Sequence, residues 1–98
     1  MFVNKDLVKK VYEMSIPNYT NFLKTKNLES LCSLYFTLMQ SLSEIENIIN
    51  LLLKTYSILR NDTYKKTIVE VCNIATNISN KVLLLQKYIC NLNKSDTI

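Results

Sequence analysis

Apolar residues recur at alternating steps of three and four through two long stretches of this chain. The spacing runs without exception from Leu28 to Leu59, and it runs unbroken again from Tyr64 to Leu92. Because an α-helix has 3.6 residues per turn, such steps keep these side chains on one face of a helix. More than four consecutive heptads is typical of helices that pack along their length in a coiled coil or bundle. The pattern therefore predicts an all-α fold.

We call these two series together the seam. Its members are Leu28, Leu31, Tyr35, Leu38, Leu42, Ile45, Ile49, Leu52, Tyr56 and Leu59, then Tyr64, Ile68, Val71, Ala75, Ile78, Val82, Leu85, Ile89 and Leu92. The positions opposite the seam are polar, as expected for the solvent face of a packed helix. They are Ser33, Gln40, Asn47 and Lys54, then Lys66, Asn73, Asn80, Lys87 and Lys94.

The phase of the seam breaks between Leu59 and Tyr64. The break falls on Arg60-Asn61-Asp62-Thr63, where Asn or Asp can cap a new helix. We predict helices over residues 27–60 and 62–93, each about 45–50 Å long at ~1.5 Å per residue. A short turn joins them as an antiparallel hairpin. One continuous rod is the alternative, and the phase break argues against it.

The first long helix carries more apolar surface than one partner helix covers. Outside the seam it adds Cys32, Leu34, Phe36, Met39, Ile48, Leu51, Leu53 and Ile58. Leaving this surface in water costs roughly several kcal/mol, so further elements should pack on it. We expect residues 1–26 to supply one helix from Asn4 to about Ser15 and a second ending near Lys26, separated at Ile16-Pro17. Residues 94–98 are expected to fray, and residues 1–98 to form a single helical-bundle domain.

The residue types exclude most catalytic and metal chemistry. The chain has no His and no Gly, which removes the commonest general base and metal ligand and also glycine-rich phosphate loops. Glu44 and Glu46 are two residues apart on a helix and so point to different faces. Cys32, Cys72 and Cys90 lack the spacing of a zinc site or a disulfide framework. We therefore predict a protein that is not an enzyme and has no cofactor and no metal, with cysteines in core or boundary positions.

Composition also bears on location and source. The start of the chain lacks the pattern of a signal peptide. The most apolar stretch, Ile45–Leu59, is interrupted by polar residues, so we predict no membrane span and a cytoplasmic protein, in the host cytoplasm or nucleus if it is viral. Phe, Tyr, Met, Ile, Asn and Lys supply 45 residues, against 3 from Gly, Ala, Arg and Pro. This bias indicates a low-GC genome, such as that of a virus, mobile element, bacterium or parasite.

The surplus apolar surface predicts a protein-interaction module that acts by helix–helix packing on a partner protein, on a second copy, or on both. Its role would be that of an inhibitor, immunity factor, adaptor or assembly subunit. The candidate contacts are Phe36, Ile48, Leu51, Ile58, Leu83 and Leu84.

The net charge of +4 supports a different prediction, a small nucleic-acid-associated protein. Its contacts would be Lys65, Lys66, Lys81, Lys87 and Lys94. Arg60 is the one arginine, and no run of like charge exceeds two residues, so this alternative ranks second.

Overall fold

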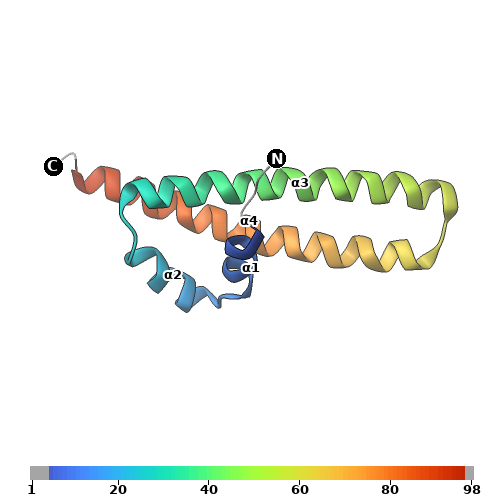
Figure 1. The fold of residues 1–98 in the computed structure, drawn as a ribbon, viewed down its shortest axis with the longest axis horizontal. Helices are drawn as coiled ribbons and strands as arrows, with labels where there is room; N and C mark the ends of the chain where they lie inside the picture. Colours follow the sequence, from blue (N-terminus) through green and yellow to red (C-terminus); the bar gives the residue numbers. More distant parts are fainter. Residues whose placement is uncertain (1–4, 97–98) are drawn as a thin grey trace.

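The protein is an all-α antiparallel hairpin with two short helices packed against one half of it (Figure 1). The computed structural model describes residues 5–96, with side chains described as far as residue 92. The long helices are α3, Leu28–Leu59, and α4, Asp62–Asp96, and the short ones are α1, Lys5–Glu13, and α2, Ile16–Lys24. The molecule measures 57 × 25 × 22 Å. The predicted hairpin is confirmed, and the continuous rod is wrong.

Side-chain caps mark the starts of α2 and α3. Ser15 caps α2 and accepts a long hydrogen bond from the Asn18 N–H at 3.4 Å, while Pro17 lies in the first turn, where its missing N–H costs nothing. Asn27 caps α3, because its side-chain oxygen accepts the Ser30 N–H at 2.8 Å. The first predicted helix is shorter than expected among the described residues, since α1 runs from Lys5 to Glu13.

The turn between the long helices uses a left-handed residue. Arg60 has φ 54° and ψ 36°, and its N–H donates to the Tyr56 carbonyl at 2.8 Å. Glycine is the usual residue at such a position, but the chain has none, so Arg60 adopts it at a cost of about 1 kcal/mol. Asn61 then accepts the Thr63 N–H at 2.9 Å and starts α4.

The seam forms the contact between α3 and α4, as the spacing predicts. Its members are buried or half-buried, except Leu28 and Leu59 at the two ends of α3. The buried core combines five seam residues with Leu34, which lies beside the seam on α3, one residue from α1 and two from α2: Val11, Tyr19, Leu23, Leu31, Leu34, Leu38, Ile78, Val82 and Leu85. Helix α4 continues to Asp96, three residues past its predicted end at 93 and into the segment expected to fray.

The two halves of the hairpin are covered unequally. In α3 every buried residue lies between Leu31 and Ser41, and in α4 every buried residue lies between Ile78 and Leu85. This is the half beside which α1 and α2 lie (Figure 1). We call the other half, residues 45–59 of α3 and 62–76 of α4, the arm. None of its side chains is fully buried, and α1 and α2 lie beside the other half of the hairpin (Figure 1).

Candidate functional site

A buried lysine fastens α1 to the hairpin. Lys81 of α4 is only 2% exposed, and its ammonium group donates to the Tyr12 carbonyl at 2.9 Å. Tyr12 lies in the last turn of α1, where carbonyl groups lack intrahelical partners and the helix dipole is negative. The lysine therefore acts as a C-terminal cap supplied from another helix. Burial lowers the pKa of the Lys81 ammonium group below its ordinary value, because desolvation disfavours the charged form.

A buried tyrosine fastens α2 at the same point. The Tyr19 side chain is 0% exposed, and its hydroxyl donates to the Lys81 carbonyl at 2.8 Å. Burial raises the pKa of the Tyr19 phenol above its ordinary value, because the phenolate would be desolvated. Residue 81 thus binds α1 through its side chain and α2 through its backbone. This junction was not predictable from the sequence, since 62 positions separate Tyr19 from Lys81.

The two short helices cover one flank of the seam. Leu7 of α1 lines a cavity together with Leu34 of α3, and the Tyr12 carbonyl of α1 receives Lys81 of α4. Leu34 and Lys81 each directly precede a seam residue in the sequence. Because α1 meets both residues, the flanks that carry them lie on the same side of the hairpin.

On α3 this flank is a second row of residues spaced by alternating steps of three and four. We call it the side stripe, and its members are Leu34, Thr37, Ser41, Glu44, Ile48, Leu51, Thr55 and Ile58. In its inner part Leu34 and Ser41 are buried. The row continues without interruption into the arm, beyond the half of the hairpin that α1 and α2 accompany.

The outer part of the side stripe is an uncovered apolar surface, which we call the outer stripe: Ile48, Leu51, Thr55 and Ile58. Ile48 is 49% exposed, Leu51 65% and Ile58 71%. Thr55 donates its hydroxyl to the Leu51 carbonyl at 2.9 Å, so this polar group is satisfied within the helix. Three predicted contact residues, Ile48, Leu51 and Ile58, therefore lie in one row.

The other predicted contacts lie elsewhere. Phe36 and Leu83 are exposed, and each directly follows a seam residue, so they lie on the opposite flank from the side stripe. Leu84 is half-buried and packs against the core of its own chain. The structure thus divides the six residues among the outer stripe, an opposite surface and the core margin.

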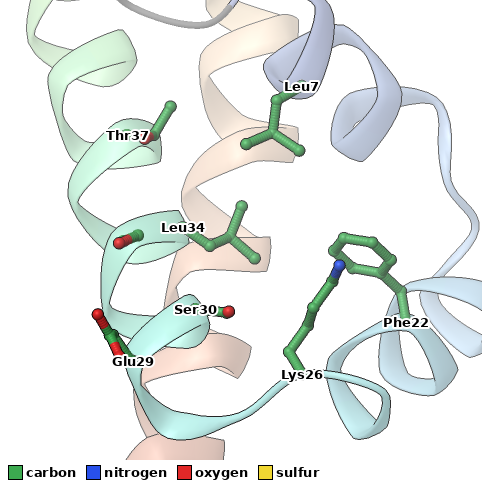
Figure 2. Close-up of a pocket in the computed structure, with 8 residues that line it drawn as sticks. Leu7, Phe22, Lys26, Glu29, Ser30, Leu34 and Thr37 are labelled. Carbon is green, nitrogen blue, oxygen red and sulfur yellow. The ribbon is translucent and has the colours of Figure 1, made fainter.

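A small cavity of about 290 Å³ opens where α1 and α2 meet the start of α3 (Figure 2). The Lys26 ammonium group lies over the Phe22 ring, 4.9 Å from its centre, and Lys10 lies 5.6 Å from the same centre. Such cation–π contacts contribute about 0.5–1 kcal/mol each at exposed sites. Leu7 and Leu34 supply the apolar wall, and Glu29 is the one acidic residue in the lining. The cavity has the chemistry of a packing gap beneath α1 rather than of a set of converging catalytic groups.

The lysines of the nucleic-acid alternative are not one surface. Lys65, Lys66 and Lys87 are exposed, but Lys81 is buried and bonded to Tyr12, so its assignment as a surface contact is wrong. The Lys94 side chain lies outside the described residues. Nucleic-acid binding through the other lysines stays a prediction.

The cysteines are free and are not core residues. Cys32 and Cys90 are exposed and line one cavity between α3 and α4, and Cys72 is half-buried. Within the part of the chain that the structure describes, no three Asp, Glu or Cys side chains are grouped as a metal site.

By length and composition, the segment Asp62–Leu92 of α4 is apolar enough to cross a membrane, although here it forms half of the hairpin. The absence of a membrane span stays a prediction.

No protein-family model, curated protein or solved structure matches this chain. The function therefore has to be argued from its own surfaces.

Proposed function

We propose that the protein is a non-enzymatic interaction module that binds a helical partner along the outer stripe. The proposal rests on one observation: the side stripe is buried at one end and exposed at the other. Leu34 and Ser41 are buried at its inner end, whereas Ile48, Leu51 and Ile58 remain about half to two-thirds exposed further along. A partner helix that packs beside the arm would cover this region, as α1 and α2 cover the other half of the hairpin.

The outer stripe supplies part of the free energy that recognition of a partner needs. Full burial of one aliphatic side chain contributes roughly 2 kcal/mol. The exposed fractions of Ile48, Leu51 and Ile58 then correspond to about 4 kcal/mol, before the cost of association and before contacts of neighbouring residues. These three residues are the contacts we propose. The role would be that of an adaptor, inhibitor, immunity factor or assembly subunit, because each of these acts by occupying a surface.

A lysine substitution tests the proposal. Leu51→Lys places a charge in the middle of the outer stripe, and Asn50→Lys adds the same charge at the next, also exposed, residue. We expect Leu51→Lys to weaken association at least about tenfold, since it removes an apolar contact and buries an ammonium group. Asn50→Lys should bind as the wild type does. Both variants should keep the helicity and melting temperature of the wild type, because residue 51 is exposed.

The measurements are sedimentation equilibrium from low to high micromolar protein and quantitative recovery of bound protein from native lysate. Stripe-dependent association, with itself or with another protein, supports the proposal. Association that is unchanged in Leu51→Lys, or complete absence of association in both measurements, overturns it.

A further inference from the structure

The charged residues of the arm are separated by sign along its length. The inner end of the arm, taken with one adjoining residue of each helix as residues 44–53 of α3 and 67–77 of α4, contains Glu44, Glu46 and Glu70 and no basic residue. The tip, residues 54–66, contains four basic residues and one acidic residue, for a net charge of +3 against −3 at the inner end. The residues of the tip are Lys54, Arg60, Asp62, Lys65 and Lys66.

Glu44 and Glu70 each directly precede a seam residue and lie on the flank that carries the outer stripe, whereas Glu46 directly follows Ile45 and lies on the opposite flank. Leu42 and Glu46 of α3 line one cavity with Ala75 and Ser79 of α4, which fixes the antiparallel register. By this register Glu70 of α4 lies at the level of Leu51, within the inner half of the arm. The four bases of the tip are all close to the turn. Within residues 5–92 none of these charged side chains forms an ion pair with another, so each set keeps its charge for a partner.

We infer that the partner of the outer stripe is a second copy of this chain, and that two arms pair antiparallel about a two-fold axis midway between Leu51 and Thr55. This inference rests on the proposed function and names its partner. A two-fold axis across the arm sets the acidic inner end of one copy against the basic tip of the other, twice. Parallel pairing sets like charges against each other, which is unfavourable.

The apolar surface fits the same arrangement. Ile48 and Ile58 are the two ends of the outer stripe, and Leu51 and Thr55 lie between them, so a two-fold axis midway between Leu51 and Thr55 places each stripe against itself in reverse order. The product is a four-helix bundle made of two arms, the helical form in which apolar rows are covered on both sides. Glu44 and Glu70 border the stripe on α3 and on α4, and Lys54 borders it between Leu51 and Ile58.

Two charge-reversed variants test the pairing. The first, Lys54→Glu with Lys66→Glu, makes the tip acidic. The second, Glu44→Lys with Glu70→Lys, makes the inner end basic. In antiparallel pairing each variant repels itself, whereas the two variants attract each other at both ends of the arm. All four changed residues are exposed or half-buried, so the fold should persist, and circular dichroism checks it.

We expect the wild type to sediment as a dimer at micromolar concentration, and each variant alone to associate about tenfold more weakly or more. An equimolar mixture of the two should recover the dimer. Phe36→Lys, on the opposite flank, should leave the dimer intact.

Three results overturn the inference: a monomeric wild type at all concentrations, a mixture that stays monomeric, or a dimer lost in Phe36→Lys but not in the charge variants. A monomeric wild type whose capture of another protein still depends on Leu51 leaves the proposed function standing and removes only the second copy.

Discussion

Removal of the Tyr19 hydroxyl measures how α2 is held on the hairpin. Tyr19→Phe keeps the ring in its buried place and deletes the hydrogen bond to the Lys81 carbonyl, 2.8 Å away. A buried hydrogen bond contributes a net ~1 kcal/mol, and the carbonyl oxygen loses this partner as well. We expect the free energy of unfolding near pH 8 to fall by about 1.5 kcal/mol, which is a drop of roughly 8 °C in Tm for a domain of this size.

The pH dependence of the free energy of unfolding provides a second test of the same side chain. The pKa of Tyr19 is raised in the folded protein, whereas in the unfolded chain it takes its ordinary value of 10.0. Between pH 10 and the folded pKa, the unfolded chain releases a proton that the folded protein keeps, so stability falls as pH rises. The loss reaches about 1.4 kcal/mol at pH 11, since each pH unit corresponds to ~1.4 kcal/mol. The phenylalanine variant has no phenol at this position and escapes this loss.

The difference in unfolding free energy between wild type and Tyr19→Phe should therefore be largest near pH 8 and nearly vanish near pH 11. Urea unfolding followed by circular dichroism measures it at each pH. Other groups titrate in both proteins and cancel in the difference. Tyr12→Phe is the control, because Tyr12 is at the surface and should change stability by less than ~0.5 kcal/mol at either pH. A difference that stays constant from pH 8 to pH 11 would refute the reasoning.

Two further predictions concern the hairpin itself and are read by thermal unfolding. Ile78→Asp, at a seam position only 1% exposed, should unfold the protein or lower its free energy of unfolding by more than about 4 kcal/mol. Ile45→Asp, half-buried in the arm, should lower it by less, and Asn80→Asp should change it little. Equal melting temperatures for the three variants would contradict the seam. Arg60→Gly should stabilise the protein by about 1 kcal/mol, since glycine adopts the left-handed conformation of the turn without strain, whereas Arg60→Ala should not.

The hairpin of two long helices is predictable because it follows from local features of the sequence. Each step of three or four in the seam depends on residues within one helical turn, and the break before Tyr64 lies in the sequence itself. The positions of α1 and α2 on the hairpin are not local. They depend on Tyr19 and Lys81, and nothing in the neighbourhood of either residue indicates that they meet. A lysine beside an apolar row is normally solvated, so Lys81 was assigned to the surface.

The exposed apolar surface was also partly predictable from the sequence. The excess of apolar residues outside the seam indicated that some surface stays uncovered, and Ile48, Leu51 and Ile58 were among the residues named. That their row is the flank covered at its other end required the position of α1, because only that helix shows which flank is already covered. Leu84 is half-buried and packs against the core of its own chain, so it does not belong to this exposed row.

Stability and association therefore depend on different residues of this hairpin. The buried side chains and both long-range hydrogen bonds, those of Tyr19 and Lys81, lie in the half that carries α1 and α2. The arm holds no fully buried side chain, and it leaves an apolar row in water and like charges grouped at each of its ends. Both features are unfavourable for an isolated arm, and the proposed antiparallel pairing of two arms would relieve both. Substitutions on the arm surface should consequently change association with little effect on folding, which makes the two properties separable by experiment.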